Sequence, residues 1–130
     1  MPRQLGVGRT LTADDVVFSL QKSANPDTSG VSGDYAGYTF GVDDVTVKVT
    51  VASPVGPAVF LPKFASYAGG YIVCQQAYEA LAGADGFANE PIGTGPFKFS
   101  SYTPQTSVLV VANDDYFRGA PKLGVGSVHR

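Results

Sequence analysis

The sequence predicts an α+β fold, in which a mixed or antiparallel sheet of about five strands carries two or three helices on one side. Three observations predict it. Apolar and polar residues alternate strictly over 45–51, a second pair of β-rich segments covers 97–112, and a capped amphipathic stretch covers 12–24. A chain of 130 residues fits one domain, whose folding buries roughly two thirds of the unfolded surface.

Composition excludes several classes of protein. Nine basic and eleven acidic residues give a net charge of −2 without a long run of either sign, so no nucleic-acid partner is expected. No apolar run approaches the roughly 18 residues of a membrane span, and residues 1–4 do not lead into the apolar region of a signal peptide. The single Cys74 cannot form an internal disulfide and is interpreted as a small buried thiol.

The first helix is predicted from its boundary signals. Residues 1–10 are rich in glycine and lack periodicity, which indicates a loose tail. Thr12 is a good N-cap, and the acidic Asp14 and Asp15 stand in the first turn, where the helix dipole favours negative charge. The helix should end near Ala24, before Asn25-Pro26. Capping explains the two adjacent carboxylates better than catalysis does.

A loop and a hairpin follow. Residues 25–36 are turn-formers, whereas residues 38–42 and 45–51 read as two strands joined across Asp43-Asp44. The alternation in the second strand puts four valines on one face, which needs a covering layer that the helix over 12–24 would provide.

The middle of the chain predicts two short helices. One covers 58–64, where Pro62 should kink or end it, and the other covers 75–82, closed by Gly83. Between them, Gly69-Gly70 is interpreted as a hinge in a turn, because the spacing fits no phosphate-binding loop. Residues 84–90 are expected to form a polar connection.

The last third predicts β structure. Gly93 and Gly95 are interpreted as backbone punctuation, followed by a hairpin of strands over 97–102 and 107–112 across the turn 103–106. Residues 116–119 should form a turn with an aromatic pair packed under it, and 123–128 a final strand.

The sequence offers no signal for an enzyme. The lone His129 is next to last, no serine lies in a nucleophile elbow, and no cluster has metal-ligand spacing, so no catalytic residue, metal or cofactor is predicted. Binding without chemistry needs only shape, aromatic rings and backbone hydrogen bonds. A stand-alone β-rich interaction module and, more remotely, a small carboxylate hydrolase stay open as alternatives.

Two ordered motifs carry a family resemblance. The run Pro-Ile-Gly-Thr-Gly-Pro-Phe-Lys-Phe at 91–99, with Asn-Asp-Asp-Tyr-Phe-Arg-Gly-Ala-Pro-Lys-Leu at 113–123, closely resembles the signature of the family 5 extracellular solute-binding proteins. The upstream Gly-Arg-Thr-Leu-Thr-Ala-Asp-Asp-Val-Val-Phe-Ser-Leu at 8–20 is similar to the helix-opening motif of that family. Asp114 stands where the family usually has proline, and Phe117 where it usually has tryptophan.

The resemblance implies a piece of a peptide, oligopeptide or nickel receptor of an ABC importer. It implies a partial lobe of the class II, peptide-type periplasmic-binding-protein fold, with a small α+β subdomain over 11–90 and a hairpin and strand over 91–130 that return toward the main lobe. The expected role is capture of peptides or similar solutes for transport, with a membrane permease as partner of the intact receptor. The expected location is extracellular or periplasmic, with no signal peptide in this chain.

The resemblance also points to ligand contacts. Tyr35 and Tyr38 end a loop that runs toward the ligand cleft in the family, and Ser66 and Tyr67 lie where a cleft-facing turn leads to a short strand near 71–73. Each tyrosine has an alternative structural role, with its ring packed on the sheet and its hydroxyl in water.

Overall fold

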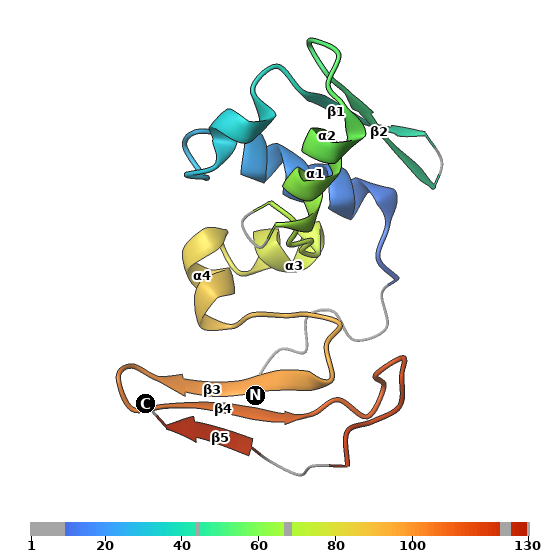
Figure 1. The fold of residues 1–130 in the computed structure, drawn as a ribbon. Helices are drawn as coiled ribbons and strands as arrows, with labels where there is room; N and C mark the ends of the chain where they lie inside the picture. Colours follow the sequence, from blue (N-terminus) through green and yellow to red (C-terminus); the bar gives the residue numbers. More distant parts are fainter. Residues whose placement is uncertain (1–9, 44, 67–68, 123–125, 130) are drawn as a thin grey trace. The chain divides into compact units, whose positions relative to one another are not determined.

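The computed structural model describes residues 10–43, 45–66, 69–122 and 126–129 (Figure 1). The chain divides into two compact units, residues 8–75 and residues 76–130 together with 1–7. We call them the hairpin unit and the sheet unit and describe each by itself. Apart from Thr10, the predicted loose tail lies outside the described residues. The expected boundary near residue 90 concerns an intact receptor and stays a prediction.

Helix α1 (Ala13–Ala24) opens the hairpin unit as the sequence predicts. Thr12 and Asp15 form a capping box, in which the Thr12 side chain accepts from the Asp15 N–H and the Asp15 carboxylate accepts from the Thr12 N–H. The helix ends before Asn25, whose N–H bonds back to the Lys22 carbonyl. Val17 and Leu20 are buried, so α1 supplies part of the core of this unit.

The first hairpin pairs β1 (Thr39–Asp43) with β2 (Thr46–Thr50) in antiparallel register, with Phe40 opposite Val49. Helix α1 contacts both strands, which confirms the covering layer predicted from the alternation. Val47, Val49 and Val51 are half-buried, but Val45 is 85% exposed because it lies in the turn, beyond the end of β2. A 3₁₀ helix, η1 (Ser32–Tyr35), ends the predicted loop.

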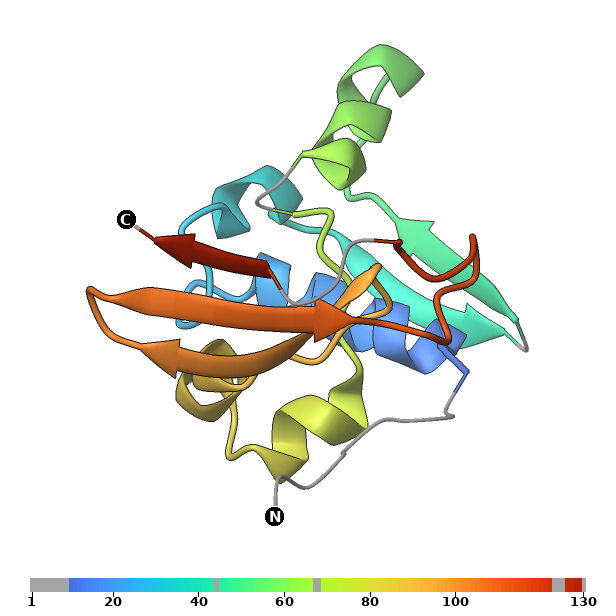
Figure 2. The same ribbon diagram turned by 90° about the horizontal axis from the view of Figure 1, so that it is seen from below.

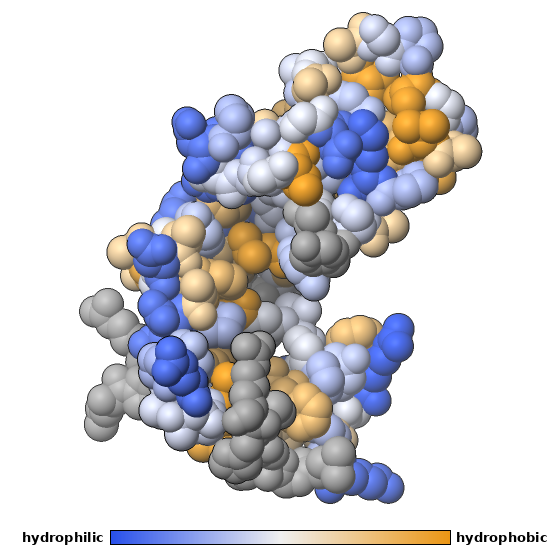
Figure 3. All heavy atoms as spheres, turned by 60° about the vertical axis from the view of Figure 1, so that its left-hand side comes forward, coloured by the Kyte–Doolittle hydropathy of each residue, from blue (hydrophilic) through white to orange (hydrophobic). Residues whose placement is uncertain are grey.

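Helix α2 (Pro57–Ala65) continues for one turn beyond a proline. Pro57 occupies its first turn, where a missing N–H costs nothing, and Pro62 lies inside without ending it. None of its residues is buried, and Val59 and Leu61 are 58% and 62% exposed. Exposed apolar atoms accordingly gather in the upper part of the space-filling view, where α2 lies (Figure 3).

The short strand expected near 71–73 is absent from the described residues, which is a correction. The Ser66 carbonyl accepts hydrogen bonds from the N–H groups of Gly69 and Gly70, which confirms the predicted turn. The chain that follows the turn runs alongside α1. There the Val73 N–H donates to the Ser19 hydroxyl, and the Gln75 N–H donates to the Asp15 carboxylate. Side chains of α1 therefore take the backbone groups that a neighbouring strand would have used.

The sheet unit begins with two short helices, α3 (Gln75–Ala80), whose first residue belongs to the hairpin unit, and α4 (Ala84–Asn89). The expectation of a polar connection over 84–90 is wrong. Phe87 packs its ring 5.9 Å from that of Tyr78, and one aromatic anchor in a polar stretch is enough to hold a short helix against its neighbour.

The rest of this unit is a three-stranded antiparallel sheet in the order β3-β4-β5. Its strands are β3 (Phe97–Thr103), β4 (Ser107–Ala112) and β5 (Gly126–His129), and Figure 2 shows β4 between the other two. The second predicted hairpin is confirmed. Of the predicted last strand, residues 123–125 lie outside the described residues. Tyr116 and Gly119 close the predicted turn, but Phe117 is 75% exposed and does not pack under it.

The α+β class and the antiparallel pairing are confirmed, with two corrections of detail. The described strands form a two-stranded and a three-stranded sheet rather than one sheet, and the described residues hold four α-helices rather than two or three. Local patterns predict which neighbouring strands form a hairpin, but they carry no information on which hairpins share a sheet.

Among the described residues, no helix combines the length and the apolar character that a bilayer crossing requires. The same residues contain no group of three histidine, cysteine, aspartate or glutamate side chains placed to hold a metal ion. Cys74 is half-buried and is not part of a disulfide.

Candidate functional site

Five rings form an aromatic cluster that joins η1, the start of β1 and α2 in the hairpin unit. The members are Tyr35, Tyr38, Phe40, Phe60 and Phe64. Tyr35 meets Phe64 with ring centres 5.7 Å apart, and Tyr38 stacks on Phe60 at 6.2 Å. Such pairs contribute about 0.5–1.5 kcal/mol each beyond the area they bury. This cluster holds α2, which has no buried residue of its own, against the rest of the unit.

Tyr35 is the buried centre of the cluster, with 2% of its surface exposed. Its hydroxyl donates to the Lys63 carbonyl at 2.8 Å. Burial raises the pKa of Tyr35 above its ordinary value of 10.0, and the nearby Asp34 and Tyr38 raise it further. The phenol is therefore a structural donor.

Lys63 covers the outer side of the cluster. Its ammonium lies 5.4 Å from the centre of the Tyr38 ring, donates to the Asp34 carbonyl and approaches the Asp34 carboxylate at 4.0 Å. Its carbonyl accepts from Tyr35 and also from the Ser66 hydroxyl, at 3.1 Å. A single residue of α2 thus links Tyr35, Tyr38 and Ser66.

The structure brings together three of the four predicted ligand contacts but gives them different surroundings. The ring of Tyr35 is packed, as in the alternative role weighed from the sequence, but its hydroxyl donates to the Lys63 carbonyl rather than pointing into water. Tyr38 keeps a partly exposed ring, and Ser66 is exposed at the C-cap of α2. Tyr67 lies outside the described residues.

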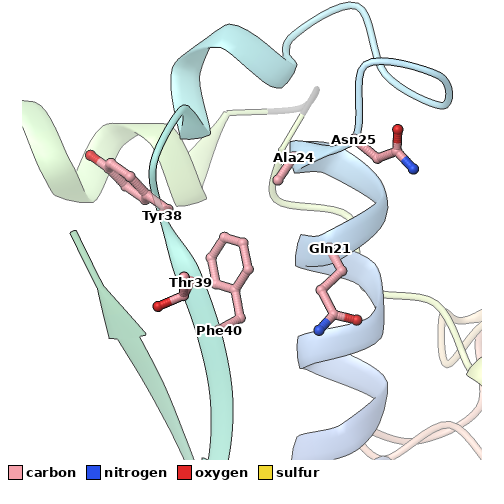
Figure 4. Close-up of a pocket in the computed structure, with 6 residues that line it drawn as sticks. All are labelled: Gln21, Ala24, Asn25, Tyr38, Thr39 and Phe40. Atoms are coloured by element: carbon pink, nitrogen blue, oxygen red, sulfur yellow. The ribbon is translucent and has the colours of Figure 1, made fainter. Parts of the chain in front are cut away.

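A shallow depression of about 340 Å³ opens beside Tyr38, between β1 and the end of α1 (Figure 4). Its lining residues are Gln21, Ala24, Asn25, Tyr38, Thr39 and Phe40. Figure 4 shows the Phe40 ring between the strand and the helix, with Gln21 reaching from the helix. The lining offers amides, two hydroxyls and rings but no charged side chain, a combination that suits neutral polar groups.

Sequence reasoning found only Tyr38 among these lining residues. Gln21 lies on the polar side of an amphipathic helix and Asn25 at its C-cap, and the pattern alone interprets both positions as solvent-facing. Their inclusion depends on the distance and angle between α1 and β1, for which the sequence carries no local signal.

Asp15 and Ser19 of α1 form hydrogen bonds to the backbone of Val73 and Gln75, and we call this pair of residues the polar clamp. Asp15 is 1% exposed, and its carboxylate accepts from the Thr12 N–H, the Thr12 hydroxyl and the Gln75 N–H at 3.0, 3.0 and 2.9 Å. Ser19 donates to the Asp15 carbonyl at 2.7 Å and accepts from the Val73 N–H at 2.9 Å. The predicted capping role of Asp15 is confirmed, and the clamp adds a contact 60 residues away in the chain.

Replacing Tyr35 with phenylalanine should change how stability depends on pH. Because the folded pKa is raised, the unfolded chain loses this proton more readily, so wild-type stability falls as pH rises above about 10. Tyr35→Phe should cost about 1 kcal/mol at pH 8 through the lost hydrogen bond and should flatten that alkaline decline. Urea unfolding followed by circular dichroism at pH 8 and 10.5 measures both effects. An equally steep decline in both proteins would contradict the assignment.

Comparison with known proteins identifies the family. The sequence profile described as "Bacterial extracellular solute-binding proteins, family 5 Middle" matches residues 8–125. The chain is 32% identical to the dipeptide-binding protein of Escherichia coli, over 88% of this chain and 24% of the relative. It is 30% identical to di/tripeptide-binding protein 4 of Pseudomonas aeruginosa, over the same shares.

Two solved structures have the same fold over nearly the whole chain. The binding protein MoaA of A. tumefaciens R10, in complex with mannopinic acid, superposes with a TM-score of 0.80 and 40% identity, covering 95% of this chain and 25% of MoaA. The oligopeptide-binding protein AppA of Bacillus subtilis, in complex with a nonapeptide, gives 0.68 and 28%, covering 92% and 25%. The chain thus spans about a quarter of the length of the relatives it matches.

The matching family consists of extracellular or periplasmic binding proteins and not of enzymes. The profile covers both motifs that carried the resemblance, the helix opening at 8–20 and the glycine-rich turn at 91–99. The chain belongs to the family 5 bacterial extracellular solute-binding proteins.

Proposed function

We propose that this chain forms part of the wall of the cleft with which the substrate-binding component of an ABC importer captures peptides or similar small solutes. The match to the family profile over residues 8–125 carries this proposal. The relatives named for dipeptides, di- and tripeptides and a nonapeptide support the substrate class, and MoaA with mannopinic acid extends it to other small polar solutes. The role is binding without chemical conversion.

Within the hairpin unit, the proposed solute contacts are Tyr38 and Ser66, with Tyr67 next to Ser66 in sequence. Tyr38 offers a partly exposed ring whose orientation is set by Phe60 and Lys63. Ser66 offers a hydroxyl at the exposed end of α2. Tyr35 serves as a positioning residue, because its hydroxyl and ring hold both neighbours through Lys63 and the cluster.

The proposed partners are the solute and, through the intact receptor, a membrane permease, and the proposed location is outside the cytoplasm. About three quarters of each relative lies outside the matched region. Receptors of this kind enclose their ligand by closing lobes around it, so most groups that fix a solute are expected on those other parts.

The proposal predicts that the 130-residue chain alone has little or no measurable affinity for short peptides, whereas a chimaera binds them. Residues 8–125 would replace the matched region of the E. coli dipeptide-binding protein, and dipeptide affinity would be measured by calorimetry. We expect a folded chimaera whose dissociation constant stays within about tenfold of that of the parent, since a wall of the same fold leaves the other contacts in place. A micromolar complex of the isolated chain with a short peptide would contradict the first expectation.

Variants of the chimaera test the residue assignment. Tyr38→Ala and Ser66→Ala should each weaken binding by about fivefold, the scale of one lost ring contact or hydrogen bond. Ser53→Ala, another exposed serine of the hairpin unit, is the matched control and should leave affinity unchanged. A chimaera that folds but binds equally well with and without Tyr38 and Ser66 would remove them from the site.

A further inference from the structure

The sheet unit carries a depression of its own, of about 380 Å³, which shares no residue with the site above. Residues at the end of α4 and along β3 line it. Its lining includes Asn89, Glu90, Phe99, Ser100, Ser101 and Tyr102.

A β-bulge shapes the strand side of this depression. The pairing register between β3 and β4 shifts between Phe99 and Ser101, so Ser100 has no partner on β4. Such an extra residue is left out of the ladder, and bulges occur preferentially at sheet edges and next to binding sites. Among the described strands, β3 lies at an edge of the sheet, so the backbone at Ser100 has no partner strand within the part of the chain that the structure describes.

The same bulge places two aromatic rings on one face. Phe99 pairs with Val110 and Tyr102 with Val108, and residues two apart in β4 point to the same side of the sheet. Tyr102 is 48% exposed, and Phe99 is half-buried. An exposed tyrosine ring attracts a cation to its face.

The helix side of the depression adds negative charge. The carboxylate of Glu90 is exposed and makes no ion pair within the described residues, and the depression has no lysine or arginine in its lining. The Glu90 backbone is held at the end of α4 by a bond from its N–H to the Gly86 carbonyl at 3.0 Å. Asn89 is held by a side-chain bond to the Asp85 carbonyl at 2.8 Å. A positive charge is favoured at the carbonyl end of a helix.

From these observations we propose that the depression between Glu90 and the bulge of β3 binds a primary ammonium group. Glu90 supplies the countercharge, the Tyr102 ring supplies a cation–π surface, and the backbone carbonyl and hydroxyl of the bulged Ser100 accept the remaining N–H groups. The α-ammonium of a peptide and the ε-ammonium of a lysine side chain share this chemistry. The expected affinity is millimolar, far weaker than the micromolar peptide complex that would contradict the receptor proposal, so the two tests remain distinguishable.

The test is a titration of the ¹⁵N-labelled 130-residue chain, followed by amide NMR spectra, with three probes at constant ionic strength. Alanine amide carries only an α-ammonium, Nα-acetyl-lysine amide carries only an ε-ammonium, and Nα-acetyl-alanine amide carries no charge. We expect saturable millimolar binding of at least one charged probe, with shifts at Ser100, Ser101 and Tyr102 and none from the neutral probe. The charged probe that binds more tightly identifies the source.

Three variants complete the test. Glu90→Gln should weaken binding about tenfold through loss of a charge-assisted contact, and Tyr102→Leu about threefold. Asp114→Asn, which removes another exposed carboxylate of the same unit outside the depression, should bind as wild type does. All three positions are exposed, so the variants should fold. Shifts that do not saturate, or that persist at full size in Glu90→Gln, would overturn the proposal.

Discussion

Gly69→Ala should destabilise the hairpin unit by about 3 kcal/mol or more, because the added methyl group enters space that is already filled. A Cβ at Gly69 would lie 1.7 Å from the Tyr35 hydroxyl, 2.8 Å from the ring carbon that bears it and 3.0 Å from the Lys63 carbonyl. The hydroxyl cannot move aside cheaply, since it donates to Lys63 and its ring is 2% exposed within the aromatic cluster. The loss is a large fraction of the 5–15 kcal/mol typical of a domain.

Urea unfolding followed by circular dichroism measures this loss, and Gly30→Ala provides the matched control. A Cβ at Gly30 would meet nothing within 4 Å, so that variant should stay within about 0.5 kcal/mol of wild type. The double variant Gly69→Ala with Tyr35→Phe should recover part of the loss, because it removes the atom in closest conflict. Equal stability of Gly69→Ala and Gly30→Ala would show that the turn can shift away from Tyr35.

Asp15→Ala should be comparably severe, costing about 3 kcal/mol, since it removes a buried carboxylate that accepts from three partly buried donors. The Thr12 N–H loses its capping partner and the Gln75 N–H loses its bond to α1. The segment that ends the hairpin unit at Gln75 would then be held through Ser19 and Val73, at 2.9 Å. Amide exchange should therefore accelerate more at Gln75 than at Val73.

Hydrogen exchange by NMR and urea unfolding together test this role. Asp14→Ala is the control at the neighbouring position, where an exposed first-turn carboxylate should be worth only about 0.3–1 kcal/mol. Asp15→Asn should fall between the two, because an amide retains the shape and one acceptor oxygen. If exchange at Gln75 were unchanged in Asp15→Ala, the clamp would not hold that segment.

The two strongest local signals predicted structure correctly for physical reasons that act within a few residues. Thr12 with Asp15 satisfies the free N–H groups of a helix start, and strict alternation over 45–51 requires one covered and one wet face. Helix α4 was missed because its polar composition conceals the ring contact of Phe87 with Tyr78 that packs it against its neighbour.

In the candidate site, too, the sequence predicts the chemistry of the residues and packing decides their surroundings. Tyr35 and Tyr38 have identical chemistry three positions apart, and the sequence nominated both as ligand contacts. Only packing separates them, since Tyr35 turns inward to Lys63 and Gly69 while Tyr38 keeps a partly exposed ring. Likewise, Gly69-Gly70 was interpreted as a hinge, and the turn was confirmed. The structure shows a further reason why glycine is required at both positions, because a Cβ on either would collide with neighbouring atoms.

By itself the sequence determined the α+β class, both hairpins, the capped first helix and, through two ordered motifs, the family. These follow from caps, periodicity and turn chemistry, which depend on near neighbours in the chain. Tertiary structure alone decided that the hairpins lie in separate sheets, that Asp15 reaches Gln75, and that Glu90 lines a depression along β3. Each of these needs residues far apart in sequence to meet, and the geometry of that meeting is set by packing rather than by local propensity.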